Sequence, residues 1–312
     1  MKDYLEVLDL TPDDLGHLFD LAVEARELPH LRDGLLEDEI VFCYFSKPST
    51  RTRVSFAAAI SHLGGEAEFF GPAELQLDRG ETIEDTAMVV SRYAAAAVIR
   101  TFEHDDVTRF ASAASIPVIN ALTNLHHPCQ ALADLLTIKE RFGRLERLRL
   151  AYVGAGNNVC HSLIQGAALS GMSIVAATPP GLAPDAGIVG GATEEAGRTG
   201  GSVSVVVDPL EAVKEADVVY TDVWLSMGDP PEEQERRRRL LAPYRVDEEL
   251  MSVAAPTAIF MHCLPAHRGD EVVAAVLDGP NSVVGDQAEN RMHTEQALLV
   301  ALLTGGLKGR TT

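Results

Sequence analysis

Cysteine is scarce in this sequence, which has 4 cysteines among 312 residues. They are widely separated, form no CxxC pair and have no histidine at the spacing of a metal finger. A disulfide framework and a structural zinc site are therefore not expected. Two of the cysteines, Cys43 and Cys160, lie in apolar surroundings and are interpreted as buried, inert thiols.

Long apolar runs and basic residues are also lacking. No apolar run reaches the roughly 18 to 20 residues that span a bilayer, and Met1 to Tyr4 show no basic segment followed by an apolar stretch. Lys and Arg number 26 against 46 Asp and Glu, a formal net charge of −20, whereas binding to phosphate backbones needs a basic face. The short run from Arg236 to Arg239 follows several acids and is interpreted as a solvated helix face. We therefore expect a cytoplasmic protein with neither a membrane nor a nucleic-acid partner.

The length and the apolar pattern predict two α/β domains. At roughly 150 residues per domain, a chain of 312 residues suggests about two. Short apolar runs alternate with stretches of helical periodicity, as in parallel sheets that are covered on both faces. The expected strands are 40–45, 96–100, 116–119, 148–153, 173–177, 203–207, 217–221, 258–262 and 282–285. The expected helices include 52–63, 83–94, 131–142, 158–170, 209–216 and 269–278.

These strands fit two doubly wound sheets better than one, with the helical stretch 131–147 as the connector. The expected domains are 1–140 and 141–291, followed by a last helix in 292–312 that packs back on the first domain. Segment 179–201, rich in Gly, Pro and Ala, is expected to be a loop with a loosely specified helix. Because ligands bind at the carboxyl ends of strands in open parallel sheets, we expect the active site in the cleft between the domains.

The segment after the first strand has the composition of an anion site. Residues 46–56 run from that strand into a helix, whose first N–H groups are unpaired at the positive end of the helix dipole. Side chains there can add charge-assisted hydrogen bonds to a phosphate, namely Ser49, Thr50, Arg51 and Thr52. A capped helix with solvent-facing arginines is the alternative. The Gly-rich pattern of a nucleotide P-loop is missing, so a small phosphate compound fits better than ATP.

Two more segments of the first half carry polar residues after strands. Arg100 ends the strand 96–100, a position where arginine serves either an anion or a surface salt bridge. His127 and Gln130 lie where a helix is expected to start, near Pro128. An imidazole N–H and an amide are suited to polarising a carbonyl oxygen, although a single histidine at such a place is also typical of a structural role.

The second half repeats this arrangement. Residues 152–159 begin like a dinucleotide-binding fingerprint, but Val159 occupies the third glycine position. Asn157 and Asn158 therefore serve a polar ligand or cap the helix. Segments 221–228 and 261–269 follow two further strands and bring an aspartate, a serine, a histidine and a cysteine to one sheet edge. Asp222 can bind an amine there, and Arg291 follows the last expected strand.

Together these motifs resemble the aspartate and ornithine carbamoyltransferase family over nearly the whole chain. Arg100 and the stretches 49–53 (Ser-Thr-Arg-Thr-Arg) and 127–130 (His-Pro-Cys-Gln) are similar to the family's carbamoyl-phosphate elements. Stretches 222–228 and 262–265 are similar to the binding loop and cysteine motif of its ornithine-specific members. Gly80 stands where aspartate-specific members use a lysine, and segment 179–201 matches poorly. The resemblance implies carbamoyl transfer from carbamoyl phosphate to the δ-amine of ornithine, giving citrulline and phosphate.

The resemblance also implies roles for individual residues. Contacts with carbamoyl phosphate are implied for Ser49, Thr50, Arg51, Thr52, Gln76, Arg100, His127, Gln130, Cys263, Leu264 and Arg291. Contacts with ornithine are implied for Asn158, Asp222, Ser226 and Met227. Arg100, His127, Asp222 and Cys263 would act in catalysis, with Cys263 either as a thiolate that accepts a proton or as a thiol that contacts the amine.

Gln76 matches a loop that reaches a neighbouring subunit's site in the family, which implies a homotrimer or a multiple of trimers. No metal or organic cofactor is required. Two other functions stay compatible with the motifs: a carbamoyltransferase for another amine such as putrescine, and a non-catalytic ligand-binding homologue. The complete set of strand-end residues favours an enzyme.

Overall fold

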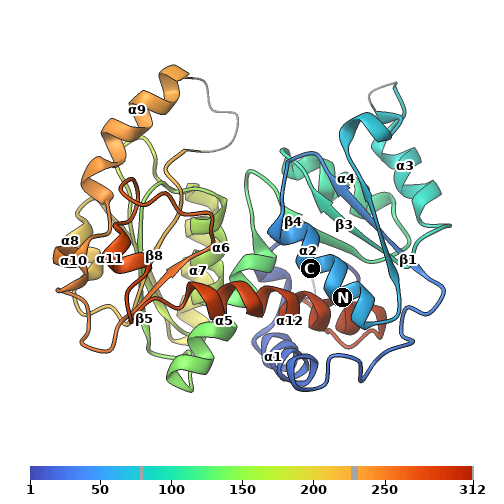
Figure 1. Cartoon of the computed structure of the whole chain (residues 1–312), viewed down its shortest axis with the longest axis horizontal. Coiled ribbons are helices and arrows are strands. Elements are labelled where there is room, and N and C mark those ends of the chain that lie inside the picture. Colours follow the sequence, from blue (N-terminus) through green and yellow to red (C-terminus); the bar gives the residue numbers. More distant parts are fainter. Residues whose placement is uncertain (78–79, 226–230, 311–312) are drawn as a thin grey trace. The chain divides into compact units, whose positions relative to one another are not determined.

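The computed structural model describes residues 1–77, 80–225 and 231–310 (Figure 1). The chain divides into two compact units: Met1–Ala133 with Asn290–Thr312, and Asp134–Glu289. Ser226 and Met227, to which the sequence assigned ornithine contacts, lie outside the described residues. Among the helices that are described, none is long and apolar enough to cross a membrane.

Unit 1 contains a parallel sheet in the order β2-β1-β3-β4. Its strands are β1 (Ile40–Phe45), β2 (Glu66–Phe70), β3 (Ala96–Arg100) and β4 (Val118–Leu122). Its helices are η1 (Val7–Asp9), α1 (Pro12–Glu27), α2 (Arg51–His62), η2 (Pro72–Glu74), α3 (Ile83–Val90) and α4 (His104–Ala113), with the start of α5 (Pro128–Phe142) and most of α12 (Val284–Leu303).

Apolar side chains of α3 and α4 cover one face of this sheet. Phe110 of α4 stacks on Phe42 of β1, with ring centroids 6.1 Å apart, and Ala87 of α3 belongs to the same buried cluster. The ends of the unit also meet, because the Met1 amino group donates to the Leu307 carbonyl at 2.7 Å. Unit 1 is therefore assembled from two separate stretches of sequence.

Unit 2 contains a parallel sheet in the order β7-β6-β5-β8-β9. Its strands are β5 (Arg149–Val153), β6 (Ser173–Ala177), β7 (Ser202–Val206), β8 (Val218–Thr221) and β9 (Ile259–His262). Its helices are α6 (Asn158–Leu169), α7 (Ala186–Thr199), α8 (Pro209–Val213), α9 (Pro231–Leu241), η4 (Ala242–Tyr244), α10 (Glu248–Met251) and α11 (Ala274–Leu277). Residues from β5, β6, β8 and β9 share one core with α8, α10 and α11.

The predicted α/β class with two doubly wound parallel sheets is confirmed. The strand expected at 282–285 is wrong: Ser282 makes a single bridge to Phe260, and α12 begins at Val284. The edge strand β2 was missed because its two glutamates interrupt the apolar pattern. Segment 179–201 holds a 14-residue helix, α7, whose start is capped by the Asp185 carboxylate accepting from the N–H groups of Gly187 and Ile188.

Candidate active site: polar groups at two sheet edges

The turn between β1 and α2 holds the predicted anion-binding residues. The N–H of Ser46 donates to the carbonyl of Arg100 at 2.9 Å, which joins the ends of β1 and β3. The N–H of Thr52 donates to Ser49 Oγ at 3.3 Å, and α2 begins at Arg51. Arg51 is exposed whereas Thr52 is buried. The loop thus presents hydroxyls and a guanidinium around the positive end of a helix.

Arg291 lies at the centre of a buried network in the same unit. Its guanidinium donates to Gln130 Oε1 at 2.8 Å and to Thr52 Oγ1 at 3.1 Å. It also forms an ion pair with Glu295, one turn further along α12, at 2.7 Å. Burial raises the pKa of the Glu295 carboxyl, while the charge of Arg291 acts in the opposite direction. Arg291, Gln130 and Thr52, predicted from three separate segments, are therefore brought together.

His127 is surrounded by positive charge. Its side chain is buried, and burial lowers the pKa of the imidazole well below its ordinary value. The charges of Arg291, Arg100 and Arg51 lower the pKa further. A histidine in this environment is neutral at physiological pH, so it can donate an N–H without carrying a charge of its own. The three guanidinium groups favour an anion in this place.

Lys47 is a fourth cation of this group, and the sequence reasoning assigned it no role. Its ammonium donates to Asn124 Oδ1 and lies 4.2 Å from the centre of the Phe102 ring. Burial, followed by the charge of Arg100, lowers the pKa of Lys47 to about 8. The available signal was its position in the same strand-end segment, two residues before Ser49.

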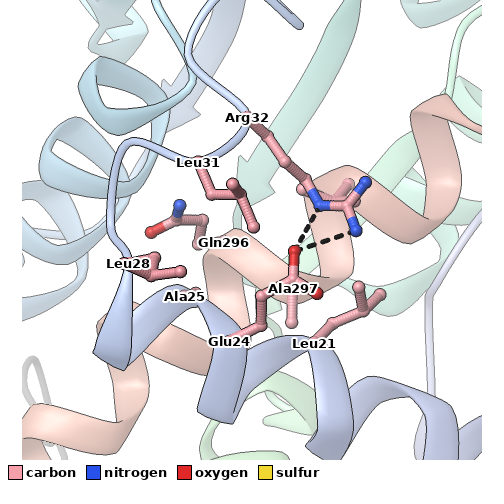
Figure 2. A pocket seen from close by; sticks show the side chains of 9 residues that line it. Leu21, Glu24, Ala25, Leu28, Leu31, Arg32, Gln296 and Ala297 are labelled. Carbon is pink, nitrogen blue, oxygen red and sulfur yellow. Dashed lines mark hydrogen bonds and ion pairs between the residues drawn. The ribbon is translucent and has the colours of Figure 1, made fainter.

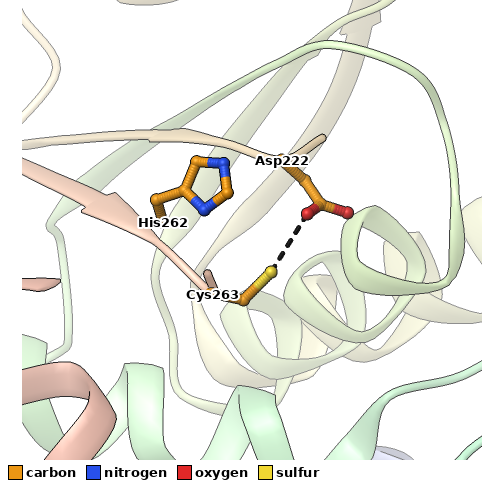
Figure 3. Close-up of side chains that lie close together, drawn as sticks. All are labelled: Asp222, His262 and Cys263. Atoms are coloured by element: carbon orange, nitrogen blue, oxygen red, sulfur yellow. Dashed lines mark hydrogen bonds between the residues drawn. The ribbon is translucent and has the colours of Figure 1, made fainter. Parts of the chain in front are cut away.

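In unit 2, Asp222 and Cys263 point toward each other from the ends of β8 and β9 (Figure 3). Cys263 Sγ lies 3.0 Å from Asp222 Oδ1. The other carboxylate oxygen accepts from Asn157 Nδ2 at 2.7 Å, and Asn157 Oδ1 caps α6 by accepting from the N–H groups of Val159 and Cys160. Asn157 therefore fixes the carboxylate to the start of a helix.

Asn158, the other asparagine of this segment, is half-buried in the first turn of α6. Of the two roles that the sequence left open, Asn157 takes the helix cap, and the ligand role of Asn158 stays a prediction. Leu264 follows Cys263 with a φ of 57°, and its N–H donates to His262 Nδ1 at 2.8 Å. The side chains of Asp222, His262 and Cys263 place atoms that could bind a metal ion within 4.8 Å of one another. Cys263 and Asp222 share a hydrogen bond, whereas the two ring nitrogens of His262 face other partners: Nδ1 accepts the Leu264 N–H, and Nε2 lies 3.4 Å from Glu271.

Of the other three cysteines, each is buried, and burial raises the pKa of each thiol. This agrees with the inert role predicted for Cys43 and Cys160.

Gln76 lies on an exposed segment between η2 and α3, where its carbonyl accepts the N–H of Glu81 at 3.3 Å. Its predicted role toward a neighbouring subunit stays a prediction.

Two pockets of unit 1 contain none of the predicted site residues. One, between α1 and α12, has a volume of about 10 Å³ and is bordered by the Arg32–Glu24 ion pair (Figure 2). The other, about 60 Å³, is lined mainly by apolar side chains of β1, β3, α3 and α4. The first has room for about one water molecule, and neither offers the cationic or amine-binding groups described above.

Two family models match the chain. Residues 2–140 match the carbamoyl-P binding domain of aspartate/ornithine carbamoyltransferase, and residues 146–302 match the Asp/Orn binding domain. Ornithine carbamoyltransferase of Symbiobacterium thermophilum is 52% identical over 304 residues, covering 97% of this chain and 98% of that protein. The anabolic ornithine carbamoyltransferase of Pyrococcus furiosus is 51% identical over 312 residues, with 98% of each chain covered.

Solved structures give the same result. The structure of ornithine carbamoyltransferase from Pyrococcus furiosus superposes with a TM-score of 0.93 and 47% identity, covering 98% of each chain. Anabolic ornithine carbamoyltransferase from Campylobacter jejuni superposes with a TM-score of 0.91 and 37% identity, covering 98% of this chain and 100% of that one.

Proposed function

The chain belongs to the aspartate/ornithine carbamoyltransferase family, and from this premise we propose that it transfers the carbamoyl group of carbamoyl phosphate to the δ-amine of L-ornithine. The products are L-citrulline and phosphate. The observation that carries the choice of ornithine is the pairing of Asp222 with Cys263 in the unit that matches the Asp/Orn binding domain. Relatives at about half identity over nearly the whole chain, which bear the name ornithine carbamoyltransferase, support it.

Unit 1 binds carbamoyl phosphate in this proposal. The phosphate contacts Ser49, Thr50, Arg51, Thr52 and Arg100. The carbonyl oxygen of the substrate accepts hydrogen bonds from Thr52, Arg100 and the neutral imidazole of His127. As the carbonyl carbon becomes tetrahedral, its oxygen gains negative charge, which these fixed donors stabilise without reorganisation. Arg291 and Gln130 face the carbamoyl group, and their mutual hydrogen bond holds both in place.

Unit 2 supplies the amine. Ornithine contacts Asn158 and Asp222, and its δ-nitrogen must lose a proton before it attacks, because an alkylammonium group has an ordinary pKa of roughly 10.4. Asp222 accepts a hydrogen bond from the amine and orients it. A thiolate 3.0 Å from this carboxylate would be opposed by a like charge, so we propose that Cys263 acts as a thiol. The nitrogen then bonds to the carbonyl carbon, the bond from that carbon to the phosphate oxygen breaks, and the leaving phosphate takes up the proton that the nitrogen releases.

Leu264 acts through its backbone carbonyl in this scheme, which together with Gln130 accepts hydrogen bonds from the carbamoyl NH₂. Since unit 1 holds one reactant and unit 2 the other, the reaction requires both groups to meet in one cleft. Aligning the two reactants there removes much of the entropic barrier of a bimolecular reaction. We expect carbamoyl phosphate to bind first and to strengthen ornithine binding.

Citrulline formation tests the function directly. Purified protein with carbamoyl phosphate should form citrulline from ornithine, and aspartate and putrescine should give little product. Turnover of putrescine above that of ornithine would contradict the requirement for an amino-acid head group, and no product with any amine would favour the non-catalytic homologue. Calorimetry tests the order: norvaline, an unreactive analogue of ornithine, should bind weakly alone and tightly once a mimic of carbamoyl phosphate is present.

We further propose a cytoplasmic homotrimer that serves arginine biosynthesis, in which Gln76 completes the site of a neighbouring subunit. A closed ring of head-to-tail interfaces lets one subunit complement the next. Mixing Arg51→Ala protein with Gln76→Ala protein should therefore restore activity, because some sites then contain both native residues. No gain after verified exchange of subunits would exclude a shared site, and each variant mixed with itself is the control.

A further inference from the structure

The segment after β9 contains a buried carboxylate that the reaction above does not use. Glu271 has 0% exposure. One oxygen lies 3.4 Å from Nε2 of His262 and accepts the backbone N–H of His267. Burial opposes its ionisation, but the contacts with His262 and the N–H of His267 outweigh burial and lower the pKa of the Glu271 carboxyl. A buried charge of this kind is retained only with partners that stabilise it.

His262 connects this carboxylate to the backbone beside Cys263. Its Nδ1 accepts the N–H of Leu264 at 2.8 Å, so this nitrogen carries no proton and the imidazole proton is on Nε2, toward Glu271. The N–H of His262 itself donates to Gln287 Oε1 at 3.0 Å. The imidazole therefore accepts a hydrogen bond from the main chain on one side and faces the Glu271 carboxylate, 3.4 Å from Nε2, on the other.

Leu264 needs such a restraint. Its φ of 57° is a conformation that non-glycine residues seldom adopt. The hydrogen bond to His262 spans Cys263, whose Sγ contacts Asp222. A change in the imidazole tautomer would place an N–H against the N–H of Leu264 and break this bond.

We infer that Glu271 is a positioning residue: by fixing the tautomer of His262, it holds the Cys263–Leu264 segment in the geometry that the substrates meet. This inference rests on the proposed roles of Cys263 and Leu264. In Glu271→Gln, the charge that favours the proton on Nε2 is lost. The amide either keeps its oxygen toward Nε2 and the His267 N–H, as a weaker acceptor, or turns its NH₂ toward both, which moves the proton to Nδ1 and removes the acceptor of the Leu264 N–H. The volume at position 271 hardly changes, so the effects of this variant come from the lost charge and not from a cavity.

Two measurements test the inference on folded, full-length enzyme. The first is the rate of alkylation by iodoacetamide, which reports on Cys263 because the other three cysteines are buried. Glu271→Gln should react about fivefold faster or more, as the segment leaves Asp222. The second is steady-state kinetics: kcat for citrulline formation should fall about tenfold or more, while the Kd for inorganic phosphate, whose binding residues lie in unit 1, should stay within about twofold.

His267→Gln is the matched control, because it keeps the backbone N–H that Glu271 accepts and changes only a side chain that is 58% exposed and whose Nδ1 lies 3.6 Å from the same oxygen. It should leave both measurements within about twofold. An unchanged alkylation rate in folded Glu271→Gln would overturn the positioning role. Faster alkylation with unchanged kcat would instead overturn the roles of Cys263 and Leu264 in the proposed reaction.

A second background tests whether Glu271 acts through His262, and Glu271→Asp, which draws the carboxylate back from Nε2, takes the place of Glu271→Gln if that variant unfolds. In His262→Gln, an amide oxygen accepts the Leu264 N–H whatever stands at position 271, so Glu271→Gln added to it should cost less than about twofold in kcat. A further loss of about tenfold in that background would show that Glu271 does not act through His262.

Discussion

Replacing Arg291 by methionine should destabilise the protein strongly, and more at high pH than at low pH. The substitution places an unbranched apolar side chain at position 291 and leaves Glu295, which is 1% exposed, without its ion-pair partner. Removing one member of a buried pair costs about 3 to 5 kcal/mol. The lost hydrogen bonds to Gln130 and Thr52 favour the upper part of that range.

The pH dependence follows from Glu295. In the folded protein, burial raises the pKa of this carboxyl above its ordinary value of 4.5, and loss of Arg291 raises it further. Below the ordinary value both the folded and the unfolded state are protonated, so the added penalty is absent. As pH rises toward the folded pKa, only the unfolded chain ionises freely, and the folded state loses stability until the penalty is complete above that pKa.

Thermal unfolding measures this effect. At about 2 to 4 °C per kcal/mol for a unit of this size, the midpoint of Arg291→Met should fall by about 6 to 20 °C near neutral pH and by less near pH 5. The control is the double variant Arg291→Met/Glu295→Gln, which removes the charge and should regain most of the loss and its pH dependence. An equal loss at both pH values, or no recovery in the double variant, would refute the reasoning.

Three other substitutions test single contacts. Asn157→Ala removes the cap of α6 and the donor to Asp222; it should cost about 1 kcal/mol of stability and raise the KM for ornithine, while phosphate affinity measured by calorimetry stays constant. Lys47, with its pKa of about 8, loses its charge as pH rises through that value. Phosphate affinity of the native enzyme should therefore fall about threefold between roughly pH 8 and 9.5 relative to Lys47→Met. If the affinities of the two proteins change with pH in parallel, Lys47 does not belong to the site. Cys263→Ser keeps a donor to Asp222 and should retain kcat within about tenfold, whereas a loss above about a hundredfold would indicate a thiolate.

The sequence was most informative where strands are buried on both faces. Such strands are continuous apolar runs, and β1, β3 and β6 were predicted to the residue. The edge strand β2 is half-exposed and tolerates glutamate, so its pattern did not distinguish it from a loop. Helix α7 contains two adjacent glycines, which lower helix propensity, and its capping aspartate carried the missing information.

Most of the site residues were predicted from their positions after strands, because parallel strands bring their carboxyl ends to one edge of the sheet, where ligands bind. Position alone could not show which side chains hold the site residues in place. Glu295 was missed, and although Asn157 was predicted as a cap or a ligand residue, its hydrogen bond to Asp222 was not. The order of residues along the chain does not tell which buried carboxylate faces which guanidinium. Lys47 was overlooked for another reason: its lowered pKa depends on burial and on Arg100, a residue from a different strand.

The division of unit 1 into two stretches of sequence has a consequence for synthesis on the ribosome. A nascent chain that ends at Glu289 already contains all of unit 2, whereas the β2-β1-β3-β4 sheet still lacks the stretch from Asn290 onward. At about 5 to 20 residues per second, Arg291 and the rest of that stretch are added within the following one to five seconds or so. The unit whose translation begins first is therefore the last to have its whole sequence, and until then the nascent chain has no guanidinium between Thr52 and Gln130.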